Sequence, residues 1–183
     1  SLGVAPETIY PALESVASVP GRAEVLHTHT AYKVILDYSH SPDAMENILS
    51  AVKEFTRGRV IIVFGCGGDR DQAKRPVMGA IAGKMADISI LTSDNPRNED
   101  PMKILDAIER GIKPTGGVYE VIENRREAIW RAMRIAREGD VVLLAGKGHE
   151  TYQEILGIKR PFNEKQIVQE LLREQNREEA GHA

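Results

Sequence analysis

The chain has 183 residues, a length that suits one globular domain with a hydrophobic core. Hydrophobic residues make up 42% and charged residues 28% of it, and this composition argues against wholesale disorder. A net charge of −3 does not favour nucleic acid as a bulk partner, and the sequence shows neither an apolar run near the ~20 residues of a membrane span nor an N-terminal secretory signal. One cysteine, Cys66, excludes an internal disulfide framework and a Cys-rich zinc site, so we expect a cytoplasmic α/β protein.

The first part of the chain predicts a short helix followed by two extended segments. Residues 1–19 carry apolar side chains at helical spacing, and Pro20-Gly21 ends that pattern. Residues 23–38 are extended around a polar turn at 27–30. Nineteen residues are too few for a domain, so we place a boundary at Pro20-Gly21 and expect residues 1–19 to be the remnant of a larger neighbouring domain.

Helices and strands then alternate regularly up to a charged tail at 175–183, which we expect to fray from Arg173. Helices are predicted to begin at Ser41-Pro42, Pro76, Pro101, Asn124 and Asn163. Short apolar strands are predicted at 60–64, 88–91, 118–122 and 141–145, and a hairpin at 151–162. Phe55 and Val77 are expected on inward helix faces. The alternation predicts a doubly wound, Rossmann-like, mostly parallel sheet with helices on both faces.

Four predicted strands end in unusual polar loops, at residues 37–43, 65–71, 92–97 and 146–150. Since the carboxyl ends of parallel strands meet at one edge of a sheet, these loops are expected to lie together, where α/β proteins bind their ligands. The strand at 118–122 leads instead into an ordinary helix cap. Four such loops make a binding site at this edge the main functional hypothesis.

The glycines at 65–68 fit two interpretations equally well, a loop that approaches a ligand and a tight strand-to-helix turn. The loop matches neither GxGxxG nor GxxxxGK[ST], and Gly146-Lys147 lacks the upstream glycine and the Ser/Thr of a P-loop. The sequence therefore predicts no standard cradle for a nucleoside triphosphate and disfavours a dinucleotide oxidoreductase.

The segment Asp94-Asn95-Pro96-Arg97 carries groups that suit a zwitterionic amino acid. Arginine offers a planar fork for a carboxylate, while Asp and Asn offer an ammonium partner and a two-sided amide. Arg70 and Glu150 add a second cation and a second anion, which matches a ligand with more than one carboxylate and ammonium group. The competing interpretation is a surface turn in which Asp94 pairs with Arg97.

Other reactive side chains in these loops carry weaker signals. His40 and His149 have no second ligand at metal spacing, so we expect His40 to contact a polar ligand and His149 to bond within its loop. Nothing marks Cys66 as an activated thiolate, and no catalytic triad is readable. Lys147 either touches ligand oxygens or faces water.

These loops together resemble the C-terminal domain of the Mur ligases. The matching stretches, in family order, are Pro20-Gly21-Arg22, residues 37–43, residues 65–71 with Lys74-Arg75-Pro76, residues 94–97, and residues 146–150 with Thr151-Tyr152-Gln153. A DNPR motif marks the diaminopimelate-adding branch of the family, whereas the lysine-adding branch usually differs at its second position. Asn95 therefore favours diaminopimelate, and we expect residues 20–174 to form the domain.

The resemblance implies a function and a set of site residues. The family reaction is ATP- and Mg²⁺-dependent amide formation, in which UDP-N-acetylmuramoyl-L-alanyl-D-glutamate is activated as an acyl phosphate and then attacked by the amine of meso-2,6-diaminopimelate during peptidoglycan synthesis. By resemblance, the residues that bind diaminopimelate are Arg70, Asp94, Asn95, Pro96, Arg97, Gly146 and Glu150. Arg22, Asp37 and His40 are implied to lie near the nucleotide, and no metal ligand is expected.

The roles implied within the site can be divided further. Arg70 and Arg97 would bind carboxylates, Asp94 and Glu150 an ammonium, and Asn95 would check the distal end, where lysine lacks a carboxylate. The family's central ATPase domain carries a P-loop, magnesium ligands and a carbamylated lysine, none of which has a match in this sequence. The resemblance implies that residues 1–19 are the remnant of that central ATPase domain. We therefore expect ATP and Mg²⁺ to be held mainly by a central domain outside this chain, and the chain alone to be inactive.

Two other functions compete with this hypothesis. The lysine-adding sister ligase shares the reaction class and is disfavoured by Asn95. A freestanding amino-acid-binding or regulatory module would need no ATPase domain, and an upstream reading frame encoding a P-loop would exclude it.

Overall fold

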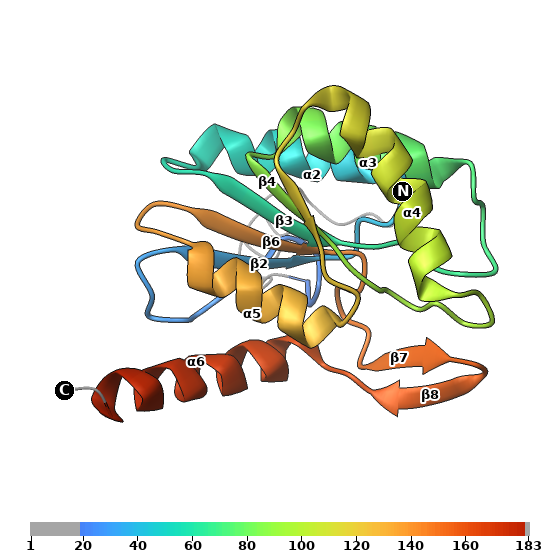
Figure 1. Cartoon of the computed structure of the whole chain (residues 1–183). Helices are drawn as coiled ribbons and strands as arrows, with labels where there is room; N and C mark the ends of the chain where they lie inside the picture. Colours follow the sequence, from blue (N-terminus) through green and yellow to red (C-terminus); the bar gives the residue numbers. More distant parts are fainter. Residues whose placement is uncertain (1–18, 182–183) are drawn as a thin grey trace, which may run out of the picture.

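The computed structural model describes residues 19–181, so the helix predicted for residues 1–19 lies outside the described residues except for Val19. A six-stranded sheet forms the centre of the molecule, in the order β1-β2-β6-β3-β4-β5 (Figure 1). Its strands are β1 (Glu24–Leu26), β2 (Lys33–Asp37), β3 (Val60–Phe64), β4 (Ile88–Leu91), β5 (Tyr119–Val121) and β6 (Val141–Ala145). Only β1, at one edge, runs antiparallel to its neighbour.

Helices cover both faces of this sheet, as Figure 1 shows. One face carries α2 (Pro42–Phe55), α3 (Lys74–Met85) and α4 (Pro101–Ile112), which the short 3-10 turn η1 (Lys113–Thr115) follows. The other face carries α5 (Arg125–Ile135) and α6 (Glu164–Gly181). The doubly wound, Rossmann-like architecture is therefore confirmed. The hairpin of β7 (Tyr152–Ile155) and β8 (Ile158–Pro161) forms a separate two-stranded sheet.

Two hydrophobic clusters hold the layers together, one on each side of the sheet. Along β3, Ile62 and Phe64 pack toward α2, α3 and α4, whereas Ile61 and Val63 pack toward α5 and α6. All five residues of β3 and of β6 are buried, as expected for parallel strands that are covered on both faces. The sheet is thus a rigid base for the loops at its carboxyl edge.

Side-chain caps define most of the helix starts that the sequence predicts. Ser41 accepts a bond from the Ala44 amide (3.4 Å), and Asn124 accepts bonds from the amides at Arg126 (3.0 Å) and Glu127 (3.3 Å). Such caps satisfy amides that have no partner within the helix. Helix α3 differs, because it begins at Lys74 rather than at Pro76 and has no side-chain cap.

Two predicted inward residues face solvent instead. Phe55 is 46% exposed because it is the last residue of α2, where Lys33 covers its ring at 5.3 Å. Val77 is 48% exposed because the buried stripe of α3 runs through Met78 and Ala82. Both predictions are wrong, Phe55 because the helix ends there, and Val77 because an apolar residue beside a buried stripe does not reveal which side of the stripe it occupies.

The ends of two other elements also differ from the prediction. Strand β5 covers only 119–121 and is half-buried, since it is an edge strand with one neighbour. Helix α6 runs on to Gly181 without fraying at Arg173. Two carboxylates on α6 hold Arg126 of α5, Glu170 at 3.0 Å and Glu174 at 2.6 Å, and these ion pairs attach the second half of α6 to the domain.

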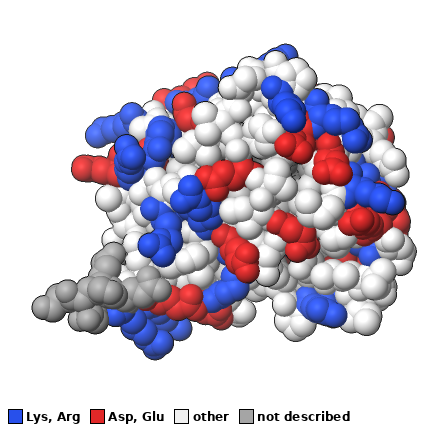
Figure 2. Space-filling view, in the orientation of Figure 1, with Lys and Arg blue, Asp and Glu red and all other residues white. Residues whose placement is uncertain are grey.

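Chain connections create a crevice at the carboxyl edge of the sheet. After β3 the chain crosses to the face of α3, whereas after the adjacent β6 it continues through the hairpin to α6 on the opposite face (Figure 1). Such a divergence between neighbouring strands is where doubly wound proteins open a binding site. On the face seen in Figure 2, basic and acidic side chains are intermingled. None of the described helices is long and apolar enough to cross a membrane.

Candidate functional site

A cleft of about 310 Å³ lies at the carboxyl edge of the sheet and draws on all four predicted loops. It is lined by Tyr38, His40, Cys66, Gly67, Arg70, Asp71, Lys74, Asp94, Asn95, Arg97, Gly146 and Glu150. Six of the seven residues that the resemblance implies for the amino acid are in this lining, and the seventh, Pro96, is buried in the same loop. The predicted convergence of distant loops is confirmed, while the roles of the individual residues remain predictions.

Glycines in the 65–71 loop allow two of these loops to pack directly on each other. A Cβ atom on Gly65 would lie 2.0 Å from the Thr92 carbonyl oxygen, and one on Gly68 would lie 1.9 Å from the Pro96 carbonyl oxygen. The Gly68 amide also donates to the Asn95 carbonyl (2.8 Å). At these two positions, the absence of a side chain therefore allows the 65–71 loop to pack directly against the 92–97 loop.

The two arginines of the site both lie close to Gly67. A Cβ atom there would be 2.8 Å from Nη1 of Arg97 and 3.7 Å from Cγ of Arg70. Arg70 is exposed, whereas Arg97 donates from Nη1 to the Gly68 carbonyl (2.7 Å) and places Nε 3.4 Å from the Glu154 carboxylate. The absence of a side chain at Gly67 thus leaves room for the Arg97 guanidinium and for the stem of the Arg70 side chain at the same part of the cleft.

Arg97 is held in a strained backbone conformation by the hairpin. Its φ is +51°, a left-handed value that is unfavourable for most side chains. Its amide donates to the Glu154 carbonyl (3.0 Å), and its carbonyl accepts from the Leu156 amide (2.7 Å). The alternative interpretation of residues 94–97 as a surface turn is wrong, because Asp94 is 8% exposed and Arg97 is paired with Glu154.

Lys147 lies beneath the cleft with no exposed surface, so the prediction that it faces water is wrong, and its ammonium is not open to the cleft in this structure. Its ammonium donates to Asn95 Oδ1 (3.0 Å) and to the Tyr152 carbonyl (2.8 Å). It also lies 3.3 Å from the carboxylate of Asp94 and 3.4 Å from that of Glu150. One buried cation therefore joins the acidic groups of two loops.

Asn95 is held at the centre of this network. Its Oδ1 accepts bonds from Lys147 and from the Glu154 amide (3.0 Å), and its Nδ2 donates to Glu150 Oε2 (2.9 Å). Gln153 completes the arrangement by donating from Nε2 to the Asp94 carbonyl (2.8 Å). The hairpin thus fixes the DNPR segment through Gln153 and Glu154.

Arg75 fixes the glycine loop from the other side. Its buried guanidinium makes two bonds to the Glu99 carboxylate (2.9 and 2.8 Å), and Glu99 also accepts from the Asp69 amide (2.6 Å). The bond from Arg75 holds the pKa of Glu99 below its usual value. The sequence pattern did not predict a site role for Arg75, which appears only in one of the stretches that match the family. No periodicity in the sequence indicates that an arginine near a helix start is buried.

The residues expected near the nucleotide form a cluster at the rim of the cleft. Arg22 stacks on the Tyr38 ring (5.0 Å), and the rings of His40 (4.7 Å) and His149 (5.1 Å) lie beside it. Burial, followed by the carboxylates of the cleft, raises the pKa of Tyr38. Asp37 is outside the lining and is buried, where it accepts bonds from the Ala23 and Ser39 amides (both 2.8 Å).

Cys66 is unsuited to nucleophilic chemistry. It is 3% exposed, its Sγ lies 3.7 Å from Sδ of Met78, and burial raises its pKa to about 12. In the described part of the chain, no group of three or more His, Cys, Asp or Glu side chains is placed so that it could hold a metal ion.

A buried ion pair supports the site from below. Arg125 of α5 and Glu164 of α6 meet at 2.8 Å with no exposed surface on either side chain. Arg125 also donates to the carbonyl of Ala145 (2.9 Å), the last residue of β6, and to the carbonyl of Ser93 (3.4 Å), which follows β4. The pair therefore fixes the exits of two strands whose loops form the cleft. The sequence analysis did not identify it.

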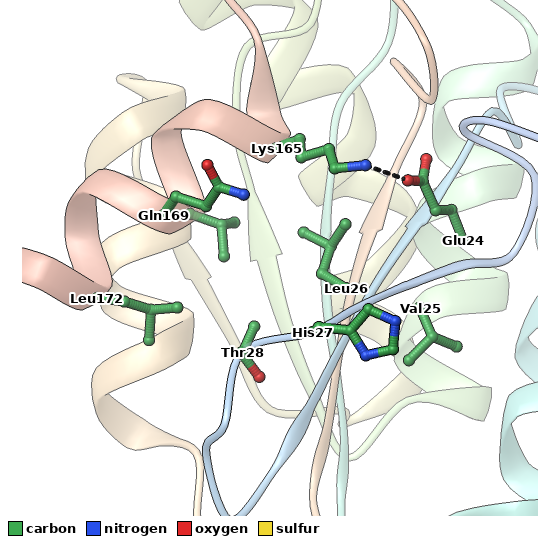
Figure 3. A pocket seen from close by; sticks show the side chains of 9 residues that line it. Glu24, Val25, Leu26, His27, Thr28, Lys165, Gln169 and Leu172 are labelled. Atoms are coloured by element: carbon green, nitrogen blue, oxygen red, sulfur yellow. Dashed lines mark hydrogen bonds and ion pairs between the residues drawn. The ribbon is translucent and has the colours of Figure 1, made fainter.

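A second cleft, of about 290 Å³, lies between β1 and α6 (Figure 3). Lys165 crosses it to the Glu24 carboxylate (2.8 Å), and His27, Thr28 and Gln169 line its sides. The ion pair lowers the pKa of Glu24. This cleft contains none of the residues that the sequence analysis assigned to a site.

Comparisons with known proteins agree with these features. The family model described as Mur ligase, glutamate ligase domain, matches residues 21–148. The chain is 51% identical over 175 residues to a protein of Clostridium acetobutylicum named UDP-N-acetylmuramoyl-L-alanyl-D-glutamate--2,6-diaminopimelate ligase 1, covering 94% of this chain and 36% of that protein. A protein of Caldanaerobacter subterraneus subsp. tengcongensis with the same name, without the numeral, is 53% identical over 173 residues, with the same coverage.

A solved structure shows the same architecture. The structure titled UDP-N-acetylmuramoyl-L-alanyl-D-glutamate--2,6-diaminopimelate ligase superposes with a TM-score of 0.81 at 38% identity, covering 95% of this chain and 36% of that one. The chain thus spans about a third of the length of the relatives that it matches.

Proposed function

The chain belongs to the Mur ligase family, and on that premise we propose that it forms the amino-acid-binding domain of an ATP-dependent ligase. The ligase would add meso-2,6-diaminopimelate to UDP-N-acetylmuramoyl-L-alanyl-D-glutamate in cytoplasmic peptidoglycan synthesis. The observation that carries the proposal is an identity of about half, over almost the whole chain, to relatives named for this reaction.

The chemistry of the cleft supports an amino acid with two charged ends. Arg70 and Arg97 would bind carboxylates, because a guanidinium group offers paired donors and both side chains line the cleft. Asp94 and Glu150 share the single ammonium of Lys147, which leaves one negative charge of the pair for an ammonium of the ligand. Gly146, with a φ of +114°, would let the ligand approach the backbone.

The contribution of this domain would be to hold the incoming amine in position. A nucleophile that is bound and oriented reacts far faster than one that must be captured from solution. Buried groups around Asn95 keep the cleft in one arrangement before the ligand arrives, which lowers the cost of binding.

ATP and Mg²⁺ do not fit the described residues. These residues contain no group of three metal-ligating side chains, and their glycine loops lack the P-loop pattern. We place both in the remaining length of a full-length ligase, with Arg22 and His40 facing the nucleotide across the rim and Asp37 buried behind them.

Calorimetric titration of the full-length ligase with meso-diaminopimelate and with L-lysine tests the proposal. We expect saturable binding of diaminopimelate and weaker binding of lysine. Arg97→Ala should lower the affinity for diaminopimelate by about tenfold or more, because it removes a charged hydrogen-bond partner. Tighter binding of lysine than of diaminopimelate would favour the lysine-adding ligase. Normal binding by Arg97→Ala would refute the role of the DNPR segment.

A further inference from the structure

Lys147 differs from the other cations of the site because it has no exposed surface and all its contacts are with the protein. An ammonium group can only donate hydrogen bonds, so the Asn95 atom 3.0 Å away from it has to be the amide oxygen. The Glu154 amide, which also only donates, contacts the same oxygen at 3.0 Å. Two independent donors therefore fix the orientation of the Asn95 side chain.

This orientation decides what Asn95 can offer to a ligand. Its oxygen accepts hydrogen bonds from Lys147 and from the Glu154 amide, while its Nδ2 donates one hydrogen bond to Glu150 (2.9 Å). An amide nitrogen carries two hydrogens, so one donor remains and no acceptor does. A group that only donates recognises a carboxylate and does not recognise a bare ammonium.

Lys147 also sets the charge balance of the cleft. Three basic and three acidic side chains line the cleft, with His40 beside them. Lys147, which is buried, and Glu154, which pairs with Arg97, add one charge of each sign, so the charges of these eight groups are equal with Lys147 in place. A balanced site suits an amino acid with no net charge, such as diaminopimelate, and a site without Lys147 would carry a net negative charge that favours lysine.

On this basis we propose that Lys147 is a positioning residue that makes the site select a zwitterionic side-chain end over a bare ammonium, by holding Asn95 as a donor and by balancing the charge of Asp94 and Glu150. The inference rests on the proposed function, and it concerns a residue that itself does not touch the amino acid.

The test compares kcat/KM for meso-diaminopimelate and for L-lysine in the full-length ligase and in its Lys147→Met variant. We expect KM for diaminopimelate to rise and the preference for diaminopimelate over lysine to fall by about tenfold or more, the size expected for one uncompensated charge in a partly buried site. Lys84→Met is the matched control, because Lys84 is exposed in the last turn of α3, and it should leave the preference unchanged.

The outcomes separate the inference from the function beneath it. If Lys147→Met lowers kcat/KM by the same factor for both amino acids, Lys147 has a structural role only, and the inference is overturned. An unaltered ligase that does not use diaminopimelate would overturn the proposed function and the inference together.

A second variant covers the case in which Lys147→Met does not fold. Asn95→Asp keeps an oxygen facing Lys147 and loses both Nδ2 hydrogens, the one that Glu150 accepts and the one left for a ligand. The preference for diaminopimelate should again fall by about tenfold, since the variant no longer offers a hydrogen to a carboxylate. An unchanged preference in Asn95→Asp would overturn the inference.

Discussion

Replacing Glu164 by glutamine should destabilise the domain strongly, because it breaks an ion pair that is entirely buried. Glu164 and Arg125 meet at 2.8 Å with no exposed surface on either side chain. The substitution keeps the size of the side chain and removes its charge, which leaves the Arg125 guanidinium between α5 and α6 without a counter-charge. Removing one partner of a buried pair costs about 3–5 kcal/mol.

The expected loss lies at the lower end of that range. A glutamine oxygen can still accept from Nε of Arg125, which now bonds to Glu164 Oε1, and the carbonyls of Ala145 and Ser93 still accept from the same guanidinium. We therefore expect a loss of about 3 kcal/mol in the free energy of unfolding. For a chain of this size that corresponds to a fall in Tm of about 6–12 °C.

The same helix offers a matched control. Glu170→Gln removes the same charge from α6, but Glu170 is 55% exposed and its partner Arg126 is 36% exposed. Ion pairs of this kind contribute less than about 1 kcal/mol. Urea and thermal unfolding of the 183-residue chain, followed by circular dichroism, measure both variants. Equal shifts for Glu164→Gln and Glu170→Gln would refute the reasoning from burial.

Two further predictions concern ionisable groups near the cleft. With a pKa of about 12, Cys66 should resist alkylation by iodoacetamide at about pH 8 in the folded chain and react readily once the chain is unfolded; rapid reaction of the folded chain would contradict its burial. The Arg75 bond lowers the pKa of Glu99 in the folded state, so Glu99 should add stability above its unfolded pKa near 4.3 and lose that contribution as the pH falls through the lower folded value. Glu99→Gln should flatten that part of the stability profile in urea titrations at several pH values, and an unchanged profile would count against the ion pair.

Local signals explain why most elements could be predicted. The strands at 60–64 and 141–145 have the predicted ends, because a fully apolar run bounded by turn residues leaves little freedom in where a buried strand begins. Hydroxyl and amide caps at Ser41 and Asn124 act within three residues of themselves. The errors at Phe55 and Val77 arose where burial depended on a neighbouring element rather than on local pattern.

The amino-acid sequence by itself determined that four polar loops would meet, because parallel strands in a doubly wound sheet place their carboxyl ends along one edge whatever their side chains are. It could not determine which charges lie beneath that edge. Lys147 and Asn95 are 52 residues apart, Arg125 and Glu164 39 apart, and Arg75 and Glu99 24 apart. Whether such a side chain faces water or is buried against a partner depends on packing between distant elements, so only the tertiary structure decided it.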